Sequence, residues 1–218
     1  MTKVNSDLDK LARCPSQWLV NFNPTKTKYL IFSKRTSIPI YPDLYLDGKK
    51  LSKVNAHCHL GLILSDNMCW DKHIREKCTK ALKRVTLLKR IGLKVPATTK
   101  RDIYISFIRP LLEYASVIYD NCSTHMSDML ENVQRQAAIT ITGAYNNTNH
   151  GRLLKETGLS LLAKRRKFAK VILINKIIKD KTPTYLKHLL PARNQTRNTR
   201  QGEDVFYIPL IRDLSETC

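Results

Sequence analysis

The stretch TKRDIYISFIRPLLEYASVIYD, residues 99–120, is the most apolar helix-length segment of this chain. Its polar side chains recur at steps of four and three residues, at Asp102, Ser106, Arg109, Glu113, Ser116 and Asp120. A helix that is apolar around most of its circumference has to be buried by other helices. Thr99 and Asp102 fit a capping box at its start. Pro110 predicts a kink, because it removes a backbone donor and presses on the carbonyl of Ser106.

Length and composition indicate a protein that folds around a real core. At 218 residues and 42% hydrophobic content, the chain is large enough for one or two domains. No apolar run approaches the length that spans a bilayer, and the N-terminal residues lack the apolar core of a signal peptide. We therefore expect no membrane partner and a nuclear or cytoplasmic location. The six cysteines are irregularly spaced, which favours free thiols.

The net charge of +20 is concentrated in two segments. Residues 70–94 carry nine Lys or Arg against two acidic residues, and residues 152–200 carry fourteen against two. Such concentration on helical segments is typical of a protein that binds a polyanion. The alternative is a pair of solvated helix faces with no ligand.

The first third of the chain predicts a helix and a small antiparallel sheet. The helix begins near the N-terminus and ends near Pro15. Residues 28–33, 41–46 and 51–64 predict strands, since they are rich in β-forming and apolar side chains. Asp47-Gly48 between two of these runs is a hairpin signal.

The rest of the chain has the periodicity of helices. One apolar stripe consists of Ile74, Cys78, Ala81, Val85 and Leu88, in a helix that Gly92 would end. Further helices are predicted over 124–142, 152–157 and, capped by Ser160, from there to residue 179. We expect residues 193–204 to be disordered and 205–211 to be extended. The predicted fold class is α+β: a helix and sheet in 1–66, a helical bundle in 67–192 and a flexible basic tail in 193–218.

Several motifs resemble one family, in the expected order, from about residue 8 to about residue 200. They are WLVNFNPTKTKYLIF (18–32), HLGL (59–62), WDKHI (70–74), IRPLLEYAS (108–116) and ENVQRQA (131–137). Together they resemble the C-terminal part of reverse transcriptases encoded by jockey-type non-LTR (LINE) retrotransposons. The resemblance implies that 1–66 is the end of the palm, and that 67–192 is the thumb and the connection beyond it.

The same resemblance implies that no catalytic residue is present. Reverse transcriptases hold two divalent ions with paired aspartates in a turn, and in this family that turn would fall before Met1. The nearest similar sequence, Tyr45-Leu46-Asp47-Gly48, has glycine at the second acidic position. Lys26 matches the lysine of the family's palm motif D, which has nothing to act on without the aspartates. We expect no cofactor, with Mg²⁺ needed only by the full-length enzyme, and no small-molecule substrate.

The predicted function is sequence-tolerant binding of RNA, DNA or their hybrid by a chain that is not itself an enzyme. The residues expected to contact phosphates are Lys72, Arg75, Lys80, Lys83, Arg84, Lys164, Arg165, Arg166, Lys167 and Lys170. Two alternatives stay open. The chain is part of a complete polymerase, or it is a degenerate relic that has a structural role or binds a protein.

Two smaller features carry alternatives of their own. His57, Cys58, His59, Cys69, His73 and Cys78 are close in sequence, but their spacing does not fit a zinc site. We expect core thiols, surface histidines and no metal, with His73 forming a hydrogen bond at a helix start. Arg109, beside Pro110, either contacts nucleic acid or pairs with Glu113 one turn later.

Overall fold

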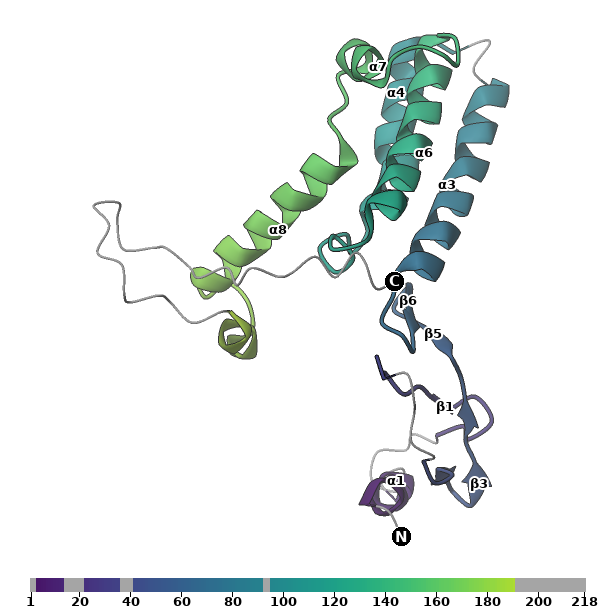
Figure 1. Ribbon diagram of the computed structural model, residues 1–218, viewed down its shortest axis with the longest axis vertical. Helices are drawn as coiled ribbons and strands as arrows, with labels where there is room; N and C mark the ends of the chain where they lie inside the picture. Colours follow the sequence, from purple (N-terminus) through teal and green to yellow (C-terminus); the bar gives the residue numbers. More distant parts are fainter. Residues whose placement is uncertain (1–2, 14–21, 36–40, 92–94, 191–218) are drawn as a thin grey trace, which may run out of the picture. The chain divides into compact units, whose positions relative to one another are not determined.

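The computed structural model describes residues 3–13, 22–35, 41–91 and 95–190 (Figure 1). Two compact units divide the chain into Met1–His73 and Ile74–Cys218. Predictions that concern Trp18, Gly92 and the tail 193–218 lie outside the described residues. Among the residues that are described, no helix is both long enough and apolar enough to cross a bilayer.

The first unit contains one helix and short paired strands. Helix α1 is Lys3–Arg13, and the side chain of Asn5 bonds both the carbonyl of Asp43 (3.1 Å) and the N–H of Tyr45 (3.2 Å). The strands are β1 (Lys28–Tyr29), β2 (Tyr45–Leu46), β3 (Lys49–Lys50), β4 (Ser52–Lys53), β5 (Ala56–His59) and β6 (Leu62–Ser65). β2 pairs with β3 and β5 with β6 in antiparallel fashion, whereas β1 and β4 are parallel.

Hairpin geometry confirms one strand prediction and corrects another. Asp47 and Gly48 have φ values of 50° and 70° and form a two-residue turn between β2 and β3. The predicted single strand over residues 51–64 is wrong. It is divided because Leu60 and Gly61, with φ values of 47° and 77°, form a second turn between β5 and β6. The predicted sheet is thus three separate two-stranded pairs.

The second unit is a helical bundle, and its core includes the apolar stripe that periodicity predicted for α3. Its helices are α3 (Asp71–Ile91, which begins in the first unit), α4 (Ala97–Ile103), α5 (Arg109–Glu113), α6 (Thr124–Thr142), α7 (His150–Thr157) and α8 (Leu162–Ile178), with the 3₁₀-helix η3 (Thr184–Leu189) after them. The α3 stripe is buried as predicted, with no member more than 5% exposed. The fold is mixed α+β and mostly helical, which confirms the predicted class.

The central stretch differs from the helix predicted for residues 99–120. It begins at Ala97 without a side-chain cap, so the capping box at Thr99 is wrong. A π-helical turn, η2 (Tyr104–Ile108), ends two residues before Pro110, and the N–H of Arg109 bonds the carbonyl of Tyr104 five residues earlier. Pro110 has no N–H to complete the regular ladder, and the wider turn accommodates this loss. The helix ends at Glu113, because Tyr114 is extended and Ala115 has φ 56°.

Capping groups fix the ends of the remaining helices. α6 has the predicted bounds, with Ser123 as its N-cap and Gly143 in the left-handed conformation (φ 71°) at its end. α7 begins two residues before the prediction, where the Asn149 side chain accepts the N–H of Gly151 at 2.8 Å. The predicted cap of α8, Ser160, is wrong. The Glu131 carboxylate of α6 accepts the N–H of Ala163 instead, at 2.8 Å.

Candidate nucleic-acid interface

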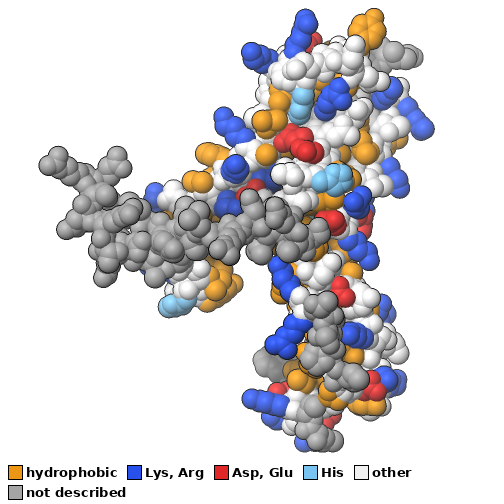
Figure 2. Space-filling model, in the orientation of Figure 1, with side chains coloured by type: hydrophobic (Ala, Val, Ile, Leu, Met, Phe, Trp, Pro, Cys, Tyr) orange, Lys and Arg blue, Asp and Glu red, His pale blue; other side chains and the backbone are white. Residues whose placement is uncertain are grey.

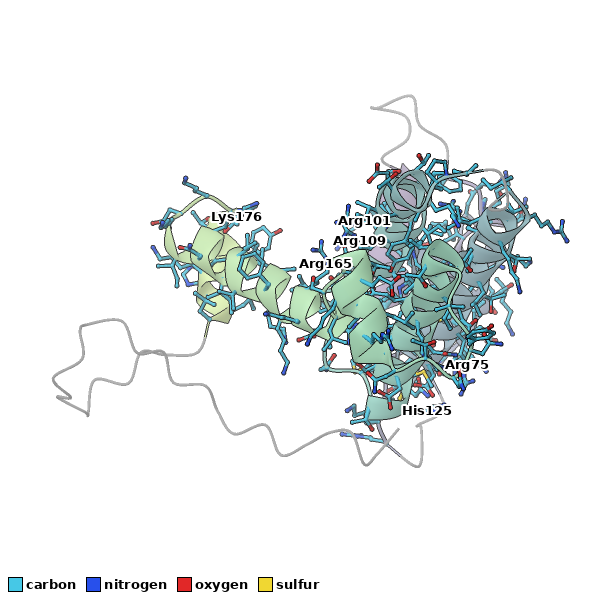
Figure 3. The ribbon with its side chains drawn as sticks, turned by 90° about the horizontal axis from the view of Figure 1, so that it is seen from above. Arg75, Arg101, Arg109, His125, Arg165 and Lys176 are labelled. Atoms are coloured by element: carbon cyan, nitrogen blue, oxygen red, sulfur yellow. The ribbon has the colours of Figure 1, made fainter. Side chains whose placement is uncertain are left out.

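The outward side of α3 carries an exposed cationic face. Burial of the apolar stripe on one side of the helix places the basic residues on the other, where Lys72, Arg75, Lys80 and Lys83 are exposed. Lys80 pairs with Glu76 one turn earlier. Within the described part of the chain, Lys72, Arg75 and Lys83 have no ion-pair partner. Arg90, which the sequence analysis did not select, is exposed on the same side. Figure 3 shows Arg75 at the edge of the bundle.

Two other basic residues of α3 instead hold the helix against the central segment. The guanidinium of Arg84 donates to the carbonyl of Phe107 and lies 3.9 Å from the centroid of the Phe107 ring. The ammonium of Lys77 lies 4.8 Å from the centroid of the Tyr114 ring. These cation–π contacts stabilise packing. Arg84, one of the ten predicted phosphate contacts, is therefore occupied within the bundle.

The basic run of α8 is divided between the surface and the interior. Lys164 and Lys167 are exposed, and no ion pair engages them in the described structure. The Arg165 guanidinium forms a bidentate pair with Glu113, which raises the pKa of Arg165 and keeps it charged. Glu113 also lies 3.6 Å from the Nε atom of Arg109, so Arg109 has the pairing that the sequence left as an alternative.

A second set of charges fastens α8 at the middle of the helix. Arg166 is 3% exposed, and its Nη2 atom donates to the Ser127 hydroxyl at 2.7 Å. Asp120 lies 3.6 Å from the Nε atom of Arg166 and 2.6 Å from the Nζ atom of Lys170. Arg166, one of the ten predicted phosphate contacts, is therefore enclosed within the bundle. The contacts of Glu113, Asp120 and Glu131 with α8 were not predicted from sequence, since their partners on α8 are 32 to 52 residues away.

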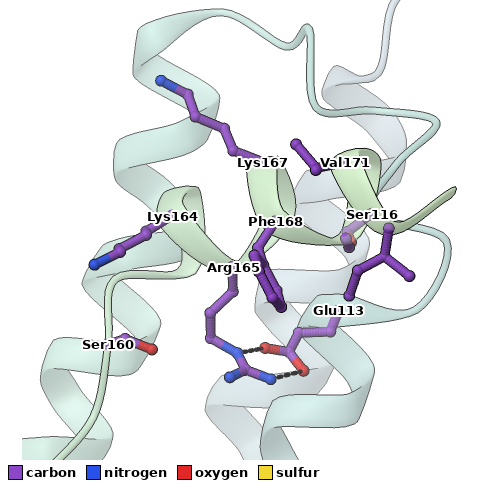
Figure 4. Close-up of a pocket in the computed structure, with 10 residues that line it drawn as sticks. Glu113, Ser116, Ser160, Lys164, Arg165, Lys167, Phe168 and Val171 are labelled. Atoms are coloured by element: carbon purple, nitrogen blue, oxygen red, sulfur yellow. Dashed lines mark hydrogen bonds and ion pairs between the residues drawn. The ribbon is translucent and has the colours of Figure 1, made fainter. Parts of the chain in front are cut away.

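Lys164 and Lys167 border a groove between α8 and the end of α5. The groove has a volume of about 830 Å³, and Figure 4 shows the Glu113–Arg165 pair beside it. Its α8 wall is largely apolar: Phe168 is 66% exposed and Val171 61%. Large apolar side chains this exposed on one helix face mark a surface that can bind a partner.

The first unit contains the remaining predicted site residues. Lys26 is exposed in a turn, where the Asn23 side chain accepts the N–H groups of Thr25 and Lys26. His73 is buried, and its Nδ1 atom accepts the N–H of Ile63 at 3.2 Å. His73 is thus a hydrogen-bonding residue at the start of α3, as predicted.

The cysteines and histidines form no shared site where the structure describes them. No three His, Cys, Asp or Glu side chains of the described residues lie close enough to hold one metal ion. Cys58 and Cys78 are free thiols, and burial raises the pKa of Cys78 to about 11. Cys69 is disulfide-bonded, which corrects the expectation of free thiols, since pairing depends on distance in the fold rather than on sequence spacing.

Two curated proteins of Drosophila melanogaster are similar to this chain. The probable RNA-directed DNA polymerase from transposon BS is 22% identical over 138 residues, which cover 62% of this chain and 15% of that protein. The probable RNA-directed DNA polymerase from transposon X-element is 25% identical over 132 residues, which cover 58% of this chain and 14% of that protein. The chain thus spans a small fraction of the length of these relatives. No protein-family model and no solved structure matches it.

Proposed function

This chain contains a region related to the RNA-directed DNA polymerases of non-LTR retrotransposons, and we propose that its helical unit binds a nucleic-acid backbone without reading base sequence. The proposal assigns the unit to the thumb and connection of a jockey-type polymerase, acting on RNA, DNA or their hybrid in the nucleus or cytoplasm. It also holds that this chain by itself does not extend a primer.

The observation that carries the proposal is the cationic face of α3. Arg75, Lys83 and Arg90 lie on one side of α3, and at 1.5 Å per residue they span about 23 Å. Cations spaced along a rigid rod can meet successive phosphates of a strand. Such contacts position a duplex but do not distinguish its bases.

Lys164 and Lys167 supply a second group of exposed cations in the same unit. Arg165 and Lys170 belong to the same basic run, but Glu113 and Asp120 neutralise them. We therefore assign phosphate contact on α8 to Lys164 and Lys167. Arg165, Arg166 and Lys170 act indirectly, because they fix the orientation of α8. Figure 2 shows other Lys and Arg side chains spread over the surface, which is why the test needs a matched charge control.

The proposed lack of catalysis is supported by the turn at Asp47. Gly48 follows Asp47 in the hairpin, so the sequence Tyr45-Leu46-Asp47-Gly48 offers one carboxylate. Two-metal catalysis requires several carboxylates around the ions. Lys26, at the motif D position, is exposed in its turn. Primer extension in the presence of Mg²⁺ and nucleotides would contradict this part of the proposal.

The test compares two triple variants with the same change of charge. Affinity for a labelled RNA–DNA hybrid is measured over a salt series for the wild type, R75E/K83E/R90E and K155E/K179E/K181E. All six residues are exposed. We expect the α3 triple variant to lose more than about tenfold in affinity and to reduce the salt slope by about two to three. The control should lose much less. Equal losses would mean that only total charge matters, and no binding by the wild type would overturn the proposal.

The exposed α8 wall favours a second candidate function, binding of a protein. Phe168 and Val171 present apolar surface that phosphates cannot use. This alternative predicts that the hybrid does not bind at low salt. It also predicts that charge reversal on α3 has no effect on any nucleic-acid affinity.

A further inference from the structure

A second groove lies between α3 and α6, on the bundle itself. It has a volume of about 730 Å³ and extends from Leu82 and Lys89 of α3 to Asn132 and Gln136 of α6. The turn that follows α6 supplies the end of its lining, which includes Tyr145. None of these residues was predicted to be a site residue, although Asn132 and Gln136 lie in the motif ENVQRQA.

The α6 side of this groove offers neutral hydrogen-bonding groups. Asn132 and Gln136 are four residues apart, so their side chains lie on one side of the helix. An amide side chain both donates and accepts. Neither amide has a hydrogen-bond partner within the described residues. Both are therefore available to the edge of an unpaired base.

The groove also has an aromatic ring that can stack on a base and lysines that can neutralise a phosphate. Tyr145 is 85% exposed, and the Arg135 side chain holds its turn by donating to the carbonyl of Asn146. Lys89 is exposed on the α3 side. The ammonium of Lys100 is fixed by a 3.2 Å hydrogen bond to the carbonyl of Thr140. Exposed aromatic rings stack on unpaired bases, and lysines neutralise the adjoining phosphates.

The groove adjoins the proposed duplex-binding face because both use α3. Lys89 lines the groove, whereas its neighbour Arg90 is on the outward side with Lys83. We infer that this groove binds an unpaired nucleotide of a single strand that continues from a bound duplex. The base stacks on Tyr145, its edge bonds Asn132 and Gln136, and Lys89 meets its phosphate. This inference rests on the proposed function and adds a single-strand site to it.

The experiment compares two probes on the full chain. One is a blunt RNA–DNA hybrid, and the other is the same hybrid with a short single-stranded extension. The wild type should bind the extended probe about tenfold more tightly, as expected for stacking of a base. Y145A and N132A/Q136A should lose most of this preference and keep the affinity for the blunt probe. The control Y185A removes a tyrosine that is 64% exposed on η3 and should keep the preference.

The possible failures are distinguishable. Equal binding of the two probes by the wild type, or a preference that survives in both groove variants, overturns the inference and leaves the proposed function intact. Loss of blunt-probe affinity in Y145A places Tyr145 on the duplex instead, and also overturns it. If neither probe binds, the proposed function fails and this inference fails with it. Circular dichroism of each variant verifies folding.

Discussion

Asp120 is the counter-charge of Arg166, the buried charged residue of α8. Its carboxylate lies between Lys170 and the guanidinium of Arg166, and its side chain is 10% exposed. We expect Asp120→Asn to lower the free energy of unfolding by about 3 kcal/mol, because it leaves a buried guanidinium without its counter-charge. Urea unfolding followed by circular dichroism measures this loss.

The exposed pair Lys80–Glu76 provides the control for Asp120. Glu76→Gln should change stability by less than about 1 kcal/mol, since a solvent-exposed ion pair contributes little. In D120N/R166M the uncompensated charge is gone, so part of the lost stability should return. Equal losses in D120N and E76Q would show that burial of Arg166 does not determine the cost.

The basic run 164–167 shows how far the sequence could predict which cations are exposed. Lys164, Arg165, Arg166 and Lys167 are equivalent by charge, but successive helix residues point about 100° apart. Two therefore meet solvent and two meet carboxylates. Placement of Arg166 on the same helix side as Leu162, four residues earlier, was a usable signal of burial. The position of its partner Asp120 was not, because the helical period of the sequence continues to Asp120, whereas the backbone leaves the helix after Glu113.

At the scale of elements, the Glu131 carboxylate links α6 to the start of α8. It accepts the Ala163 N–H, which has no partner inside its own helix. Glu131→Ala should therefore lower the free energy of unfolding by about 1 kcal/mol, which is a typical cost for loss of an N-cap. Hydrogen exchange should become faster first at residues 162–165. Glu156→Ala, an exposed change on α7, is the matched control and should affect neither measurement.

A helix whose start, apolar period and end are all marked in the local sequence was predicted correctly. α6 has a capping serine, an apolar period and a terminal glycine, and its bounds were predicted correctly. The central segment has no such consistency, since its apolar residues continue past Glu113 while the backbone turns at Ala115. Tyr119 explains why: it is buried, and its hydroxyl donates to the carbonyl of Leu112. An apolar residue can be buried from a turn as well as from a helix, and composition does not separate the two.

At the scale of the whole molecule, the exposed apolar wall of α8 is a surface through which copies of the chain can associate. The chain carries a net charge of +20, which keeps copies apart at low salt, but salt screens that repulsion. We expect the wild type to self-associate as salt is raised and F168S/V171S to remain monomeric, as measured by sedimentation velocity. Tyr185→Ser removes one exposed aromatic ring outside the groove and is the control. Identical sedimentation of all three at every salt concentration would contradict this prediction.

The π-helical turn at Tyr104–Ile108 also determines which changes of chain length the central segment can tolerate. A π turn holds one residue more than the α-helical turn that it replaces. Loss of a single codon between Ile103 and Arg109 would convert it to a regular turn and leave the helices on either side facing the same core. A regular turn would again require the N–H that Pro110 lacks. Loss of one residue should therefore be tolerated here when the proline is replaced as well, whereas loss of one residue inside α6 would rotate its buried side toward solvent.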